Sequence, residues 1–239
     1  MKVHIAVIAI HEEPYIYEFI EHYQKIGISK IYLYDNHPSA TLSTLRRLPI
    51  IHYIHYPGAQ KQLPAYHHAV TQATRENDEG IPDFLGFIDV DEFIVFENGM
   101  NTIQEFLGQE HFREYSAVAF PWKQFYSDGM INYEPRPVTE RFFIGHMHKH
   151  FKSFVRPVEM IFFNNPHYFV TQNGTRNAGG SKTLADAEDP CDYVENTAVL
   201  HHYFTKSYQE FMLKLKRGSS DIVRHRPFSD FFPEHFKHL

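Results

Sequence analysis

Residues 84–93 read Phe84-Leu85-Gly86-Phe87-Ile88-Asp89-Val90-Asp91-Glu92-Phe93. The apolar run is typical of a buried β-strand, and the acids that follow it need a compensating partner. Alternate residues of an extended segment point the same way, so we expect Asp89 and Asp91 to face one hard cation and Glu92 to face elsewhere. Mn²⁺ or Mg²⁺ fits this site, because Mg²⁺ accepts one or two carboxylates together with substrate phosphate oxygens. The simpler alternative is a strand end capped by two acids.

The residues before this stretch alternate between apolar runs and segments with helical periodicity. The apolar runs predict strands at 3–10, 31–34, 50–55 and 84–88. Helices are predicted from Pro14 to Gly27 and over 63–76, each with a proline suited to its first turn. This alternation favours an α/β fold with a mostly parallel sheet and crossover helices. Ligands of open α/β sheets bind at the carboxyl ends of the strands, where the acids lie.

The second half of the chain is less regular. From about Tyr115 onward, Pro, Gly and Asn separate short β-like pieces at 117–120, 141–144 and 151–155. A late helix begins with the capping-box pattern of Ser207 and Glu210 and ends at Gly218. No repeat or linker divides the sequence, so one domain over 1–239 is expected, with an irregular α+β second half. The tail at 225–239 has no predicted structure.

Composition excludes several classes of protein. The 239 residues are 43% apolar, which suits a single core, and the only cysteine is Cys191. A disulfide framework is therefore excluded; we expect a buried thiol and a cytoplasmic location. No stretch approaches the roughly 20 apolar residues of a membrane span. A net charge of -6 argues against a nucleic-acid partner.

Several short motifs carry a family resemblance through their order and spacing. The chain resembles the GT-A-fold glycosyltransferases, in particular the family-92 and family-2-like group, from Val3 to about Gly218. The matching segments are 11–15, 32–36, 62–66, 87–93, 121–125, 152–157, 201–207 and 214–218. The resemblance implies a GT-A-type, Rossmann-like fold in which 1–100 binds a nucleotide-sugar and 101–239 forms the acceptor side.

The resemblance also implies an enzyme and its substrates. A hexose or pentose would pass, with inversion, from a nucleotide-diphosphate donor, a UDP-sugar, to a hydroxyl group of a glycan acceptor. Asp89 and Asp91 would bind the donor's diphosphate through Mn²⁺ or Mg²⁺. Glu13 and Asp35 match positions that face the base and ribose, and Gln62 belongs to a matching segment of the donor site. For Asp35, a turn closed by its own carboxylate is an equal alternative.

His202 matches a histidine near the C-terminus that completes the metal shell in several GT-A enzymes. His201 stands where relatives often have Asn. Fixed cations can stabilise the negative charge that develops on a leaving diphosphate. The candidates for this role are Lys152, Lys206, Lys214 and Arg217. A solvated basic face of the late helix is the alternative.

An inverting transfer needs a base that accepts the proton of the attacking hydroxyl. Asp128 is the candidate, because it follows Trp122, Phe125 and Tyr126, which could form a platform for a sugar ring. The alternative is that these aromatic side chains belong to the hydrophobic core. Because the charges of the pair are expected to serve a cation, Asp91→Asn should leave folding almost unchanged.

Three other functions are compatible with parts of the sequence. A non-catalytic nucleotide-sugar-binding module of the same fold is the main alternative, although the intact Asp89 and Asp91 pair speaks against a degenerate site. A nucleotidyltransferase is disfavoured because the segment 11–15 contains no glycine. A metal-dependent hydrolase could use the histidines at 146–150, which lack well-placed acids beside them.

Overall fold

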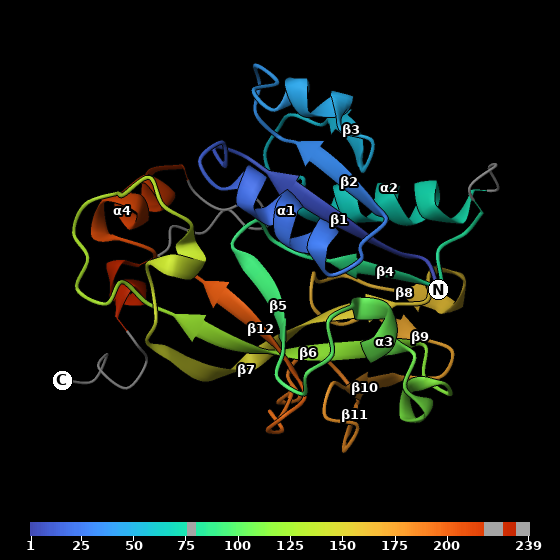
Figure 1. Ribbon diagram of the computed structural model, residues 1–239. Helices are drawn as coiled ribbons and strands as arrows, with labels where there is room; N and C mark the ends of the chain where they lie inside the picture. The colour runs from blue at the N-terminus through green and yellow to red at the C-terminus, as the bar shows by residue number, and fades with distance from the viewer. Residues whose placement is uncertain (76–79, 218–226, 233–239) are drawn as a thin grey trace.

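The computed structural model describes residues 1–75, 80–217 and 227–232. One large sheet runs through it in the order β11-β10-β6-β7-β4-β1-β2-β3, and β12 joins the sheet by pairing with β6 and β5. Figure 1 shows the helices on both sides of this sheet and α4 beyond the ends of β6 and β12. The strands of the sheet are β1 (Val3–Ala9), β2 (Lys30–Asp35), β3 (Ile51–His55), β4 (Phe84–Phe87), β5 (Glu92–Phe96), β6 (Ala117–Phe125), β7 (Gly145–Val155), β10 (Thr175–Asn177), β11 (Thr183–Leu184) and β12 (Ala198–Tyr203).

The N-terminal half is a parallel α/β unit. β1 pairs in parallel with β2 on one side and with β4 on the other, and β2 pairs in parallel with β3. Helix α1 (Ile16–Lys25) packs with Val3, Ile5 and Val7, whereas α2 (Gln62–Thr74) packs with the alternate residues Ala6 and Ile8. The two helices therefore cover opposite faces, and the carboxyl ends of β1 and β4 form a topological switch point.

The C-terminal half is mixed. β7 is antiparallel to both β4 and β6, while β12 is parallel to β6 and antiparallel to β5. A separate pair, β8 (Met160–Phe162) and β9 (Val170–Thr171), lies off the main sheet. The remaining helices are α3 (Ile103–Leu107) and α4 (Tyr208–Arg217), with short 3-10 turns at Ser43–Arg47, Glu110–Phe112, Val138–Glu140, Pro157–Glu159 and Phe228–Phe231. β7 links the two halves into one sheet, because it pairs with β4 on one side and with β6 on the other.

Most of the local predictions are confirmed. The four N-terminal strands, the two helices between them and a mostly parallel sheet in that half are present. Ser207 Oγ accepts from the N–H of Glu210, whose carboxylate accepts from the N–H of Ser207, so the capping box begins α4. Cys191 is a buried free thiol. None of the described helices is long and apolar enough to cross a membrane.

One element and one helix boundary differ from the predictions. Residues 141–144 are not a strand; the backbone N–H groups of Phe143 and Ile144 donate to Asp128, which holds them in a loop before β7. α2 ends at Thr74, before the predicted end at residue 76. Residue 76, Gly218 and the tail apart from 227–232 lie outside the described residues.

Candidate functional site

Asp89 and Asp91 lie in a tight turn between β4 and β5. The N–H of Glu92 donates to the carbonyl oxygen of Asp89 at 3.0 Å, and residues 88–91 belong to neither strand. The prediction of an extended segment is therefore wrong. The turn gives the two carboxylates different partners.

Asp89 faces helix α2 and β7. Its Oδ1 accepts from Gln62 Nε2 at 3.0 Å and from the Tyr66 hydroxyl at 3.3 Å, and its Oδ2 lies 2.9 Å from Lys152 Nζ. Burial raises the pKa of Asp89, but Lys152 outweighs that effect and the pKa is lowered. The side chain of Asp89 is 31% exposed, whereas that of Lys152 is fully buried. Asp89 therefore keeps an edge open to a ligand.

Asp91 is the more buried acid, with a side chain 7% exposed. Its Oδ2 lies 2.8 Å from Lys214 Nζ and 3.3 Å from Lys206 Nζ, and its Oδ1 lies 3.6 Å from His202 Nε2. Burial would raise the pKa of Asp91, but Lys214, Lys206 and His202 hold it well below its usual value. Asp91 is thus a buried carboxylate between two lysines.

Glu92 does not face away from the pair, as expected from an extended segment, but lies against Asp89. Its Oε2 accepts from the N–H of Asp89 at 2.8 Å and lies 3.7 Å from Lys152 Nζ. Its Oε1 is buried without a hydrogen-bond partner among the described residues. Burial raises the pKa of Glu92 well above its usual value, which favours the neutral acid. Glu92 shapes the turn and supports Lys152.

The two histidines of β12 point to opposite sides, as neighbours on a strand do. His202 lies beside Asp91, with its ring centroid 4.4 Å from that of Trp122. His201 packs instead on Phe125, at 4.7 Å. Burial lowers the pKa of His202 to about 4, so its imidazole is neutral at pH 7. His202 Nδ1 is buried and lacks a hydrogen-bond partner in the described part of the chain.

A cavity of about 420 Å³ opens between α4 and the loop that joins β1 to α1. The charged and aromatic residues that line it include His11, Glu12, Tyr15, Lys206, Lys214 and Arg217. Arg217 Nη1 lies 2.6 Å from Glu12 Oε1 and donates to the carbonyl oxygen of Ile10 at 2.5 Å. The C-terminal turn of α4 is thereby tied to the end of β1, and the lysines that hold Asp91 form one wall of the cavity.

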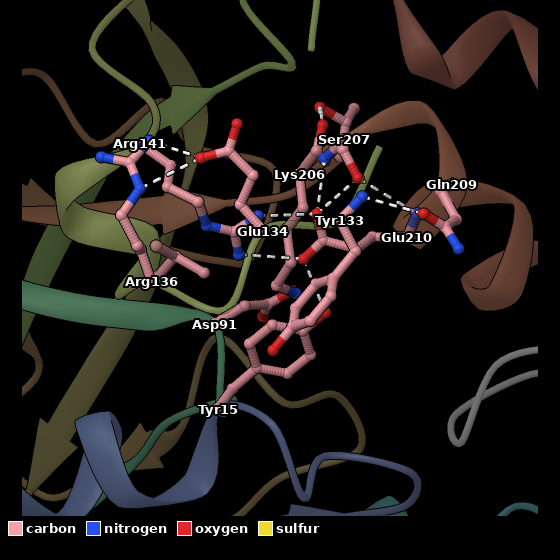
Figure 2. A network of polar contacts seen from close by, with 12 residues as sticks. Tyr15, Asp91, Tyr133, Glu134, Arg136, Arg141, Lys206, Ser207, Gln209 and Glu210 are labelled. Carbon is pink, nitrogen blue, oxygen red and sulfur yellow. Dashed lines mark hydrogen bonds and ion pairs between the residues drawn. The ribbon is translucent and has the colours of Figure 1, made fainter. Parts of the chain in front are cut away.

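A buried polar network fixes the start of α4, and Figure 2 shows Glu210 at its centre. Arg141 donates to both carboxylate oxygens of Glu210, at 2.8 and 3.0 Å, and the Tyr15 hydroxyl donates to the same carboxylate at 2.7 Å. Lys206 Nζ lies 4.5 Å from the centre of the Tyr15 ring. Lys206 also has a positive φ of 55°, a strained conformation for a lysine. The network therefore holds Lys206 against Asp91.

Asp35 and Glu13 lie at the neighbouring strand ends. Asp35 is fully buried; its carboxylate accepts from the N–H groups of His37 and Leu42 and from the Tyr53 hydroxyl. The contact with His37 is the predicted turn closed by an Asp side chain. Glu13 is exposed and accepts a hydrogen bond from the Thr41 hydroxyl.

Asp128 lies on an exposed loop after β6, apart from the turn that carries Asp89 and Asp91. Its Oδ2 accepts from the N–H of Phe143 at 2.6 Å and from that of Ile144 at 3.1 Å. Trp122 is largely buried. Its ring lies near those of four histidines, His148, His150, His167 and His202.

Several residues of this site were not predicted from the sequence. Tyr66 lies in the segment 62–66 that carries the family resemblance, but only Gln62 was predicted as a site residue there. Tyr66 contacts Asp89 because it lies one helical turn after Gln62. Glu12 and Arg217 meet across almost the whole chain, and so do Tyr15 and Glu210. Nothing local marks such pairs, apart from the position of Glu210 in the capping box.

Comparison with known proteins gives one extended match. A family model described as glycosyltransferase family 92 matches residues 5–231. No curated protein sequence matches the chain significantly. Among solved structures, the chain is similar to residues 1–349 of TarS from S. aureus, with a TM-score of 0.36 and 16% sequence identity. That similarity covers 56% of this chain and 39% of the TarS chain.

Proposed function

Because the chain belongs to glycosyltransferase family 92, we propose that it transfers a sugar from a UDP-sugar to a hydroxyl group of a glycan, with inversion. The observation that carries the donor assignment is the pair of lysines, one just before α4 and one within it, that lies against Asp91. Lys206 and Lys214 both line the cavity and both contact Asp91 Oδ2, so a ligand in the cavity meets their charges directly. A nucleoside diphosphate needs such charge neutralisation as it departs.

The cavity has the charge balance that a diphosphate requires. Among the described residues, four cationic side chains and two carboxylates line it. The cations are Lys206, Lys214, Lys216 and Arg217, and the carboxylates are Glu12 and Glu210. Both carboxylates are already in ion pairs, Glu12 with Arg217 and Glu210 with Arg141. In this proposal residues 1–100 bind the nucleotide and 101–239 form the acceptor side. Lys206 and Lys214 reach back to the donor. Gln62 and Lys152 position Asp89 beside it.

The donor atoms beside Asp91 fit a divalent cation that has few protein ligands. Within the described part of the chain, no group of three or more His, Cys, Asp and Glu side chains is arranged to hold a metal ion. Asp91 Oδ1 and the neutral imidazole of His202 lie 3.6 Å apart, and Asp89 has an exposed edge nearby. One or two protein ligands suffice when phosphate oxygens and water complete the shell, and a carboxylate with an imidazole suits Mn²⁺.

The chemistry of the transfer follows from these charges. The acceptor oxygen attacks the anomeric carbon of the donor, and the bond from that carbon to the diphosphate breaks with its electrons on the diphosphate. A bound Mn²⁺ or Mg²⁺ would supply Lewis-acid neutralisation of that charge. Lys206 and Lys214 lie at fixed positions on Asp91 and would stabilise the same charge without reorganisation. Asp91 orients both lysines.

Calorimetry with UDP-, GDP- and dTDP-sugars in Mn²⁺ tests the proposal. We expect UDP-sugars to bind, with Lys214→Ala weakening binding at least about tenfold, or about 1.4 kcal/mol. Lys149→Ala is the matched control, because Lys149 is an exposed lysine of β7 whose ion pair with Glu188 is long, at 3.8 Å. Binding by none of the donors, or equal binding by the parent and Lys214→Ala, would contradict the donor site. Slow release of UDP without acceptor would exclude the non-catalytic alternative.

A further inference from the structure

Two histidines of β7 form a close pair beside the proposed donor site. The rings of His148 and His150 stack with centroids 4.7 Å apart, and their Nδ1 atoms are 2.9 Å from each other. Both side chains are half-buried. Two nitrogens at that distance share one proton, because a proton on each would place two N–H groups head to head.

The backbone decides which histidine holds the shared proton. The N–H of His150 donates to His148 Nδ1 at 3.3 Å. A backbone N–H can donate a hydrogen bond but cannot accept one. His148 Nδ1 is therefore an acceptor, and His150 Nδ1 carries the hydrogen. In the neutral ring of His150 the lone pair then lies on Nε2, which is the basic nitrogen. Protonation there turns the shared contact into a charge-assisted hydrogen bond, so His148 stabilises the imidazolium of His150.

The Trp122 ring connects this pair with His202, which lies beside Asp91. The Trp122 ring lies between the two, 4.4 Å from the His202 ring and 5.6 Å from the His150 ring. His167 lies 5.6 Å from His150 and interacts electrostatically with both His150 and Asp89. A single aromatic ring therefore separates His150 from the histidine that lies beside Asp91. Asp128 Oδ2, in contrast, accepts hydrogen bonds from two backbone N–H groups of an exposed loop.

On the premise of the transferase proposed above, we infer that His150 is the catalytic base and His148 its positioning residue. The acceptor hydroxyl gives its proton to His150 Nε2 as its oxygen forms the bond to the anomeric carbon. The bond between that carbon and the diphosphate breaks, and its electrons leave with the diphosphate. His150, now an imidazolium that donates from Nδ1 to His148, returns to neutrality by releasing the proton to solvent. The acceptor is a sugar hydroxyl that reaches His150 Nε2.

The tautomers can be measured without any turnover. Long-range ¹H–¹⁵N NMR spectra at pH 8 should show His150 protonated on Nδ1 and His148 protonated on Nε2. His148→Gln should release His150 from this single tautomer. The opposite assignment in the parent, with the basic nitrogen of His150 at Nδ1, would overturn the inference.

The kinetic arm uses UDP-glucose, UDP-galactose and other UDP-sugars with a panel of methyl glycosides as acceptors. We expect His150→Gln to lower kcat about 100-fold or more, with the affinity for UDP-sugar within about twofold of the parent. His148→Gln should lower kcat less, and Asp128→Asn and the exposed His146→Gln should keep it. If the parent were active and His150→Gln had the same kcat, the assignment of His150 as the base would be refuted, and the proposed function would stand. A parent that bound no nucleotide-sugar would instead refute the proposed function on which it rests.

Discussion

Arg141 and Glu210 form a bidentate ion pair with N–O distances of 2.8 and 3.0 Å, and both side chains are at most 3% exposed. The pair joins the loop before β7 to the first turn of α4, one turn before Lys214. Burial would raise the pKa of Glu210, but Arg141, Ser207 and Tyr15 lower it below its usual value. The pair therefore holds in place the helix that carries a lysine to Asp91.

Glu210→Gln should destabilise the protein by about 3–5 kcal/mol, because it leaves the buried Arg141 guanidinium without its counter-charge. The matched control is Glu134→Gln, which removes the exposed partner of Arg136 in the same region (Figure 2) and should cost less than about 1 kcal/mol. Urea unfolding measures both variants. If both variants lost the same free energy of unfolding, the buried Arg141 pair would contribute no more to stability than an exposed ion pair.

Asp91→Asn should also destabilise the protein, in contrast to the expectation from the sequence. The carboxylate lies between the largely buried Lys206 and Lys214, so its removal leaves two cations facing each other. We expect a loss of about 3 kcal/mol or more. A second substitution, Lys214→Met, should restore part of the loss in a double-mutant cycle. A variant as stable as the parent in urea would show that the lysines do not depend on Asp91.

Stability should fall as the pH drops below about 6.5. Burial lowers the pKa of four histidines to about 4, namely His4, His22, His201 and His202. In the unfolded chain these groups take up protons near pH 6.5, whereas the folded protein does not. The unfolded state thus binds more protons between about pH 4 and 6.5, and the free energy of unfolding decreases there. Urea midpoints at pH 7.5, 6.5 and 5.5 in EDTA measure the effect. A flat profile would contradict it, and His4→Asn should make the profile shallower.

The regular elements could be predicted because their signals are local. The alternation of apolar runs and helical periodicity gave β1 to β4 and both crossover helices, and the Ser207 and Glu210 spacing gave the start of α4. The acids at the end of β4 were placed at the correct edge of the sheet. The prediction that this segment is extended was wrong. The segment turns because the N–H of Glu92 donates to the carbonyl oxygen of Asp89.

The partners of the acids could not be predicted in the same way. Lys206 and Lys214 follow Asp91 by 115 and 123 residues, so only the packing of α4 against the strand ends brings them together. Resemblance placed these lysines near the diphosphate but gave no sign that they hold a carboxylate. Arg141 was assigned to a strand, because its apolar neighbours in 141–144 have β propensity that the loop overrides.

EDTA should stop release of UDP, and Mn²⁺ should restore it. The diphosphate carries more negative charge than Lys206 and Lys214 can neutralise while both also face Asp91. The measurement is UDP release from a UDP-sugar, with and without EDTA, in the parent and in the matched control Lys149→Ala. Full activity in EDTA would assign the neutralisation to the lysines alone.

His202→Ala should weaken Mn²⁺-dependent binding of UDP by about tenfold or more, which corresponds to about 1.4 kcal/mol. His202 Nε2 lies 3.6 Å from Asp91 Oδ1, and the imidazole is neutral because burial lowers its pKa to about 4. His201→Ala is the matched control, since the neighbouring ring packs on Phe125 at the opposite side of β12. Calorimetric titration of UDP with Mn²⁺ into both variants at pH 7.5 measures the difference. If the His202 variant bound UDP as tightly in Mn²⁺ as the parent, His202 would be a packing partner of Trp122 and not a ligand of the metal.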